Sequence, residues 1–459
     1  MTTTRLASAV LIAVAGCGGD SGPCDPVAQS GCDNGKACEQ VAGSDTPACF
    51  APVELHGRVM NLANNAGVAG ARVVALDVNG AAASGVAISA ADGRYALQVP
   101  AQRGAGGAPS AFPVTLRADA VGFQSFPGTI RQPLPIDVAT ATPLNGSYVV
   151  QSALTDIGLI AQAAAAGAIH GHVAVADDHP GVLVVAEASG KGFAVIAARD
   201  GDYAIFNLAA GHYTVTAYAR GHVYTPGETD VTGDVKLDLA LASSAPGSLS
   251  GQIEIVNGGT GSTTSVVAFV ESTFDPVTGR GAPPPGLRAP SSGPPSVSGA
   301  FTIDGVPPGK YVVVAAFEND DLVRDPDHCI AGTADVHVQV AAGQAAPIAT
   351  SFKVTGALAV MSPGATQAEA VTAAPALRWA DDSSEDHYVV EVFDSFGQRV
   401  WNTTISGVSG GTPTVTYGGP MAPGMYYQFR VTSTKTQGGT GTTCELSRSE
   451  DLRGVFYVP

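Results

Sequence analysis

Four of the seven cysteines lie between residues 24 and 49, where sulfur at this density either forms disulfides or holds a metal. They are Cys24, Cys32, Cys38 and Cys49. No two of them have the C-x2-C spacing of a zinc knuckle, and no histidine lies among them, so the spacing favours disulfides over zinc. Four cysteines allow three pairings, and the sequence leaves all three open. Cys329 and Cys444 form a further candidate pair, which would tie together the last two domains of the chain.

An acidic stretch near residue 320 carries carboxylates, which are the ligands that Ca²⁺ prefers. Its candidate ligands are Asp320, Asp321, Asp325 and Asp327. Their spacing does not follow the EF-hand loop, so a Ca²⁺ site stands beside the alternative of a solvated acidic loop. His170 and His172 share one face of a predicted strand, but no third metal ligand lies near them in the sequence. We therefore expect no cofactor, with Ca²⁺ as the one alternative.

One stretch matches the G-x-S-x-G pattern of a serine nucleophile, at residues 407–411. That chemistry needs a sharp turn from a strand into a helix, which aims the serine at a paired histidine. Here Ser409 lies in a glycine-rich loop between predicted strands, and no helix is predicted after it. We find no catalytic residues elsewhere, and the sequence predicts a protein that is not an enzyme.

Carbohydrate binding is the strongest binding hypothesis that the aromatic residues allow. The chain has two tryptophans, Trp379 and Trp401. Trp379 is better explained as a core residue, whereas Trp401 alternates with Arg399 on a predicted strand and is the candidate for an exposed sugar-binding ring. The scarcity of tryptophan argues against a strong sugar site in the first three quarters of the chain.

The N-terminus has the pattern of an export signal, residues 1–17, with Arg5 before an apolar run at residues 6–15. The run is too short to span a bilayer. It ends in Val-Ala-Gly-Cys, residues 14–17, which resembles a bacterial lipobox. The resemblance implies cleavage before Cys17 and a lipid on its sulfur, and the Gly18 that follows implies the outer membrane of a Gram-negative cell. The alternative is an ordinary signal peptide with a chance cysteine.

A short repeat organises the rest of the chain. It consists of Gly-x-aromatic, an alternating apolar run and Gly-x-Tyr, with the second aromatic ten residues after the first. Two complete copies place these aromatics at Tyr203 and Tyr213, and at Phe301 and Tyr311; a half copy ends at Tyr95. Glycine-bearing turns between alternating runs predict paired strands.

Three regions carry this repeat, at residues 52–160, 167–243 and 247–355, which we call the first, second and third modules. Each has a G-x-[VI] strand before the repeat, and the first two also have a later glycine, followed by Phe123 or His222. In this order of elements they resemble carboxypeptidase regulatory-like domains, which implies transthyretin-like β-sandwiches. The third module contains a Pro/Gly/Ser-rich insertion at residues 279–298, predicted to be an exposed loop or local linker.

The fourth module, residues 356–459, follows another pattern. Trp379 lies on an early strand, Tyr388, Val390 and Val392 share one face of a strand, and tyrosines begin a late strand near residue 426. This arrangement resembles a fibronectin type III domain, in which an early tryptophan packs in the core and a tyrosine forms the corner before a late strand.

Composition agrees with an all-β fold of tandem β-sandwich modules, immunoglobulin-like or transthyretin-like. Apolar residues make up 45% of the chain and charged residues only 14%, with 57 glycines for turns. The net charge of −17 excludes nucleic acid as a natural partner and disfavours anionic lipid. Residues 18–51 are too short for a core and are predicted to be a disulfide-stapled stalk below a semi-rigid arm of modules.

Together these features predict a non-catalytic, lipid-anchored protein of the cell envelope, exposed to the periplasm or the cell surface. It would act as a structural or adhesive scaffold whose partner is an envelope protein or extracellular polysaccharide. The alternative is a carbohydrate-binding accessory lipoprotein.

Overall fold

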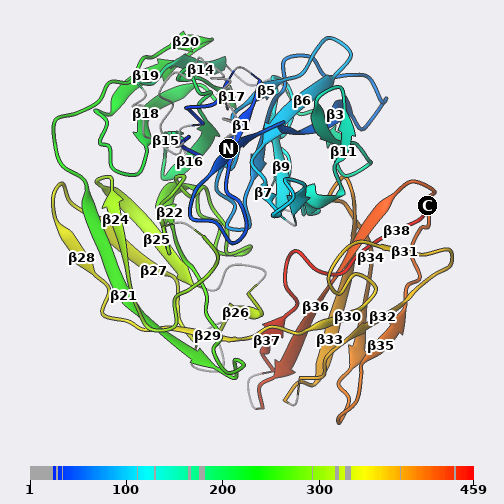
Figure 1. Cartoon of the computed structure of the whole chain (residues 1–459). Coiled ribbons are helices and arrows are strands. Elements are labelled where there is room, and N and C mark those ends of the chain that lie inside the picture. The colour runs from blue at the N-terminus through cyan, green and yellow to red at the C-terminus, as the bar shows by residue number, and fades with distance from the viewer. Residues whose placement is uncertain are drawn as a thin grey trace, which may run out of the picture.

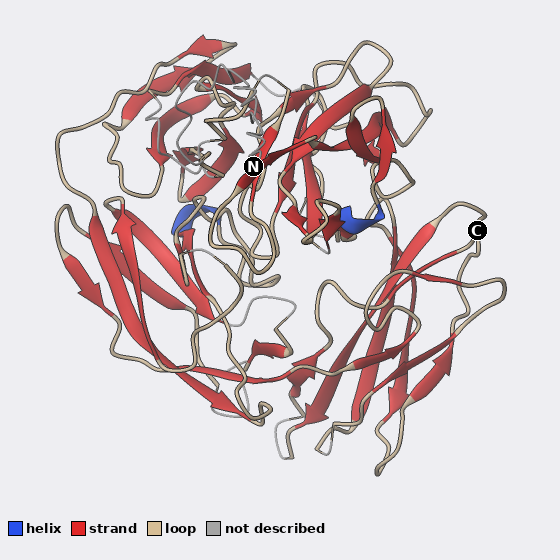
Figure 2. Ribbon diagram, in the orientation of Figure 1, coloured by secondary structure: helices blue, strands red, loops and turns tan. Residues whose placement is uncertain are grey.

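Alternating apolar and polar side chains build most of this chain into strands. In strand β6 (Arg94–Val99) exposed and buried residues alternate without interruption, because successive side chains on a strand point to opposite faces. The computed structural model describes residues 24–26, 29–33, 35–110, 112–128, 131–163, 167–174, 181–291, 293–315, 320–325, 332–382, 384–438 and 441–459. Within these ranges the helical elements are two 3₁₀ turns, η1 (Val138–Thr140) and η2 (Glu271–Thr273), as Figure 2 shows. The predicted all-β fold of tandem sandwiches is confirmed.

The first module has two sheets, ordered β10-β9-β4-β5 and β11-β12-β3-β13, with β6 also paired to β3. Their strands are β3 (Val53–Asn61), β4 (Arg72–Leu76), β5 (Ala87–Ile88), β6, β9 (Pro113–Asp119), β10 (Ile136–Asp137), β11 (Thr142–Leu144), β12 (Ser147–Val150) and β13 (Ile157–Leu159).

The second module has sheets β17-β14-β20 and β16-β15-β18-β19. These strands are β14 (Gly167–His172), β15 (Leu183–Ala188), β16 (Lys191–Ile196), β17 (Asp202–Leu208), β18 (Gly211–Tyr218), β19 (Gly227–Val231) and β20 (Val235–Lys236).

The third module has sheets β24-β21-β29-β26, with β28 on β21, and β23-β22-β25-β27. These strands are β21 (Gly247–Val256), β22 (Val266–Val270), β23 (Arg288–Ala289), β24 (Ala300–Val306), β25 (Gly309–Ala315), β26 (Leu322–Arg324), β27 (Val336–Val340), β28 (Ala345–Pro347) and β29 (Phe352–Gly356).

The fourth module has sheets β30-β32-β35 and β31-β38-β36-β33-β34, with β37 on β36. These strands are β30 (Val360–Ser362), β31 (Glu369–Ala370), β32 (Ala376–Trp379), β33 (His387–Asp394), β34 (Arg399–Ser406), β35 (Thr414–Thr416), β36 (Tyr426–Thr436), β37 (Thr443–Arg448) and β38 (Val455–Tyr457). Trp379, Tyr388, Val390 and Val392 are all fully buried, as expected from the sequence. The Tyr427 hydroxyl accepts a hydrogen bond from the Ala422 amide at 2.9 Å, which is the contact of a tyrosine corner.

The repeated glycine and tyrosine serve one structural purpose in the first module. The Tyr95 hydroxyl donates a hydrogen bond to the Thr155 carbonyl at 2.5 Å. This ring and carbonyl lie directly over Gly57, where a β-carbon would come within 1.9 Å of the Thr155 oxygen. The opening strand therefore needs glycine so that the returning chain can pass close to it.

The same arrangement recurs in the second module and changes in the third. Tyr203 donates to the Leu237 carbonyl at 2.7 Å above Gly171, whose β-carbon would meet that oxygen at 1.9 Å. In the third module Phe301 replaces the tyrosine, and its ring covers Gly251 together with the Ile348 side chain. The repeat thus encodes a packing contact rather than a reactive group.

Gly201→Ala is expected to destabilise the second module by more than about 2 kcal/mol. Gly201 has φ +94°, and a β-carbon there would meet the Val173 carbonyl oxygen at 2.3 Å. The matched control is Gly190→Ala, at φ +77° with nothing within 4 Å of its β-carbon, which should cost only about 1 kcal/mol. Chemical denaturation of both variants measures the difference, and equal costs would contradict the steric explanation.

The cysteine-rich segment is not a separate stalk. Its strands β1 (Ala37–Glu39) and β2 (Ala48–Phe50) form a hairpin, and a second small hairpin pairs β7 (Gln102–Arg103) with β8 (Pro109–Ser110) of the first module. Arg103 joins them, because its backbone bonds to Gln40 and Ala42 and its side chain forms a fully buried ion pair with Glu39. The sequence-based prediction of a stalk is wrong because this pairing links residues far apart in the chain.

The proline-rich insertion of the third module is not simply an exposed loop. It contributes strand β23, which pairs with β22, and it buries Leu287, Ala289 and Val297 in the core. Periodicity could not reveal this, because the buried residues are separated by prolines and glycines rather than arranged in a regular alternation.

The four modules close into a ring rather than extending as an arm (Figure 1). The second and third modules share one apolar core, in which Leu183, Val185 and Tyr218 pack with Tyr311 and Val313. The ring closes where the Gln132 amide of the first module donates to the Gly397 carbonyl of the fourth at 3.1 Å. Contacts at these two junctions join the second module to the third and the first module to the fourth.

Candidate functional site

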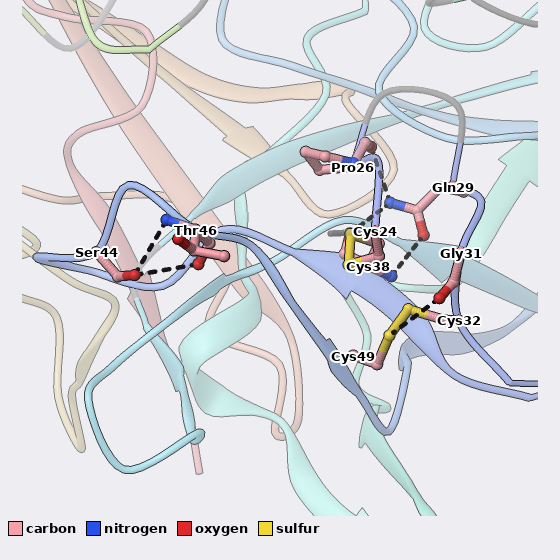
Figure 3. Close-up of a disulfide and its surroundings, with 9 residues drawn as sticks. All are labelled: Cys24, Pro26, Gln29, Gly31, Cys32, Cys38, Ser44, Thr46 and Cys49. Carbon is pink, nitrogen blue, oxygen red and sulfur yellow. Dashed lines mark hydrogen bonds between the residues drawn. A yellow bond between two sulfur atoms is a disulfide. The ribbon is translucent and has the colours of Figure 1, made fainter. Parts of the chain in front are cut away.

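Two disulfides pair the clustered cysteines as Cys24–Cys38 and Cys32–Cys49 (Figure 3). The Gln29 side chain braces this segment by accepting from the Cys38 amide at 3.1 Å and donating to its carbonyl at 2.7 Å. Within the described ranges, the one group of three potential metal ligands within 4.8 Å of one another is Cys24, Cys32 and Cys49. These sulfurs are in disulfides and offer no thiolate, so the described cluster is structural.

The remaining cysteines are only partly described. Cys444 is buried and disulfide-bonded. Cys17 and Cys329 lie outside the described residues, so the lipidation of Cys17 and the pairing of Cys329 with Cys444 remain predictions. No helix in the described part of the chain is long and apolar enough to cross a membrane.

The acidic stretch places its described carboxylates in different surroundings. Asp320 accepts hydrogen bonds from the Thr264 hydroxyl at 2.6 Å and the Leu322 amide at 3.0 Å. Asp325 is buried beside Lys353, whose ammonium lies 3.4 Å from it. Asp321 is exposed, and Asp327 lies outside the described residues. Asp320 and Asp325 thus each have a protein partner, and Ca²⁺ binding here stays a prediction.

Burial raises the pKa of Asp320 to about 6, although its hydrogen bonds oppose the shift. The native state therefore keeps a proton that the unfolded state releases near pH 4, so stability must fall as the pH rises from about 4 to 6. Asp320→Asn is expected to gain stability relative to the wild type over this window, by about 1 kcal/mol after allowing for partial exposure. Thermal unfolding in EDTA at pH 4 and pH 7 tests this, with Asp321→Asn as the exposed control. An advantage of Asp320→Asn that is equal at both pH values would contradict it.

The other candidate side chains have structural surroundings. Trp401 is half-buried and lies edge-on against Tyr417, with ring centroids 5.4 Å apart. Ser409 lies in an exposed loop that leads into strand β35, not a helix. His170 and His172 are both exposed, and His172 pairs with Asp202 at 3.3 Å.

Sequence reasoning missed the place where the four modules meet. There, lining residues from all four surround a cavity of about 380 Å³. At the fourth-module end, Arg280 and Arg430 both pair with the buried carboxylate of Asp451, Arg430 at 2.6 Å. Elsewhere in the lining, Arg117 of the first module pairs with Asp119 at 2.9 Å and donates to the Ala194 carbonyl of the second. Arg280 lies in the insertion that the sequence predicted to be solvent-exposed.

The arginines at this junction are held in a poorly solvated setting. Desolvation lowers the pKa of Arg280 and of Arg430 to about 9, and repulsion from nearby arginines, Arg448 among them, adds to the effect. Asp451 offsets part of this cost by accepting from both guanidinium groups. A junction that holds charges out of water in fixed positions is suited to hydrogen-bonding a bound molecule.

Comparison with known proteins identifies no family for this chain. No protein-family model matches it, and neither does any curated protein. Similar solved structures include the minor pilin GBS52 of Streptococcus agalactiae, with 14% identity over 43% of this chain and 99% of the pilin and a TM-score of 0.20. A DUF3823 family protein from Bacteroides uniformis has 14% identity over 46% of this chain and 99% of its own, with a TM-score of 0.22. A streptococcal ancillary pilin has 12% identity over 66% of this chain and 98% of its own, with a TM-score of 0.17. These TM-scores are too low to support a fold assignment. The assignment of β-sandwiches rests on the strand pairing within this chain.

Proposed function

We propose that this protein is a non-catalytic scaffold of the bacterial cell envelope, exported and held to the membrane by a lipid on Cys17. The observation that carries the scaffold role is the closed ring of four sandwiches, joined by hydrogen bonds and a shared core. A rigid ring presents loops from several modules in fixed relative positions, which is what a structural or adhesive protein requires. The two disulfides support export, because such bonds persist in oxidising compartments.

Polar contacts between neighbouring modules support the rigidity that this role needs. Between the first and second modules, the side-chain amide of Asn207 donates to the Ala120 and Phe123 carbonyls, each at 2.8 Å. Between the second and third, the Gly221 amide donates to the Gly305 carbonyl at 2.7 Å. These bonds fix orientation as well as distance, because each of them ends on a backbone carbonyl that cannot rotate away.

The anchoring part of the proposal is tested by metabolic labelling with a fatty-acid analogue in a Gram-negative host. The full chain should incorporate the label and partition with membranes, whereas Cys17→Ser should do neither. Cys444→Ser serves as the control, because loss of labelling there would indicate misfolding. Equal labelling of the wild type and Cys17→Ser would refute lipidation of Cys17.

The scaffold part is tested by offering the isolated full chain to envelope extract and to purified polysaccharides, with and without EDTA. Retention of one envelope protein supports the scaffold. Retention by polysaccharide alone instead supports the alternative, a carbohydrate-binding accessory lipoprotein, and loss of binding in EDTA would direct attention to Asp320. Trp401, half-buried with its ring edge-on to Tyr417, stays the candidate aromatic residue for that alternative.

A further inference from the structure

The cavity at the meeting point of the modules has the size of a small-ligand site. Its volume of about 380 Å³ lies in the range of pockets that enclose one or two rings. All four modules contribute to its wall, including most of strand β16 of the second and residues 280–283 of the third. Such a site exists only because the ring closes.

The charges that line this cavity balance. Among the described lining residues, four are arginines and four are aspartates. They are Arg117, Arg131, Arg280 and Arg430, and Asp77, Asp119, Asp275 and Asp451. Arginine only donates hydrogen bonds and aspartate only accepts them, so neighbouring pairs present both functions side by side. A balanced wall attracts neither anions nor cations strongly, but it matches groups that donate and accept at once.

One of the aromatic residues that line the cavity is partly exposed. Phe193 on strand β16 lines the cavity and is 38% exposed, in contrast to the buried apolar residues of the module cores. The Tyr213 ring contacts the Phe193 ring edge-on, with ring centroids 6.2 Å apart. The Arg117 guanidinium donates to the backbone carbonyl of the adjacent residue, Ala194, so the Arg117–Asp119 pair lies beside strand β16.

We propose that this cavity binds an uncharged, hydroxyl-rich ring, a monosaccharide or disaccharide, with its apolar face on Phe193. Each hydroxyl of such a ligand donates one hydrogen bond and accepts up to two, which suits the Arg117–Asp119 and Arg280–Asp451 pairs. About a third of the Arg280 side chain is exposed. The inference does not depend on lipid anchoring or on the scaffold role.

The test is titration calorimetry of the full exported protein with glucose, N-acetylglucosamine, maltose and cellobiose, and with benzoate as an anionic comparison. We expect at least one sugar to bind with a Kd of about 10 µM to 1 mM. Because the ligand is uncharged, its affinity should change less than about twofold between 50 and 500 mM salt. Binding of benzoate but of no sugar would overturn the proposal.

Phe193 supplies the decisive variants. Phe193→Ala and Phe193→Leu should each weaken sugar binding about tenfold or more, the second while keeping most of the apolar volume. The matched control is Leu144→Ala, which also removes an exposed apolar side chain. Leu144 is 46% exposed and is not among the residues that line the cavity. Sugar binding that is unchanged in folded Phe193→Leu would overturn the proposal, even if the protein still bound a polysaccharide elsewhere on its surface.

Discussion

Arg103→Met is expected to be among the most destabilising single changes in the chain, costing about 3–5 kcal/mol at neutral pH. The Arg103 and Glu39 side chains are 0% and 1% exposed, and they form an ion pair with each other. The guanidinium also donates to the Ala51 carbonyl at 2.6 Å and lies between two aromatic rings, 4.9 Å from Phe50 and 5.2 Å from Tyr148. Removing Arg103 would leave the Glu39 carboxylate buried with only the Ala101 amide as a partner.

The pH dependence of this cost follows from the state of Glu39. Burial already raises the pKa of Glu39, and the Arg103 guanidinium opposes that rise. Without the guanidinium, the native state gains a proton that the unfolded state lacks at neutral pH, so the variant should be most destabilised at pH 7 and less so near pH 5. Urea denaturation at the two pH values measures the change, and hydrogen exchange of the β1–β2 hairpin shows whether the docked segment opens.

The double variant Glu39→Leu/Arg103→Met is the control for this prediction. It removes both charges and leaves apolar side chains of similar length, which is often neutral for a buried pair. We expect it to recover most of the lost stability and to abolish the pH dependence. If the double variant is as unstable as Arg103→Met alone, the cost comes from packing around Arg103 and not from an unpaired carboxylate.

The sequence was sufficient for the features that depend on local pattern. Alternation predicted the strands, and the buried face of Tyr388, Val390 and Val392 follows directly from the two-residue period. Trp379 was correctly assigned to a core, because a large apolar ring on an apolar strand is stabilised by burial. Disulfides were expected from the cysteine density, although the choice among three pairings needed the structure.

Features that depend on long-range geometry were not predictable in this way. The Arg280–Asp451 contact joins an insertion of the third module to a loop of the fourth, and neither segment has a regular period. Closure of the ring depends on angles between modules, which hydrophobic alternation does not encode. From the sequence, a charged residue in a proline- and glycine-rich segment is predicted to be solvent-exposed. In the structure, Arg280 instead lines a cavity.

Tyr311→Ala is expected to cost about 3–5 kcal/mol and to separate the unfolding of the second and third modules. Tyr311 is fully buried, its hydroxyl donates to the Pro307 carbonyl at 2.7 Å, and its ring meets Tyr218 of the second module edge-on at 6.2 Å. The two modules share one apolar core through this contact, so they should unfold together in the wild type. Calorimetry should show their single transition divide into two in the variant.

Two further variants separate the loss of the interface from the loss of a buried tyrosine. Tyr311→Phe keeps the ring and loses only the bond to Pro307, so it should cost about 1 kcal/mol and leave the transition single. Tyr213→Ala removes the equivalent tyrosine of the second module, whose hydroxyl likewise donates four residues back, to Ala209 at 3.1 Å, but whose ring contacts Phe193 of its own module. It should lower stability without separating the modules from each other. If Tyr213→Ala divides the transition as readily as Tyr311→Ala does, the coupling of the modules depends on their general stability and not on the Tyr311 contact. That result would contradict the description of the ring as a single rigid body.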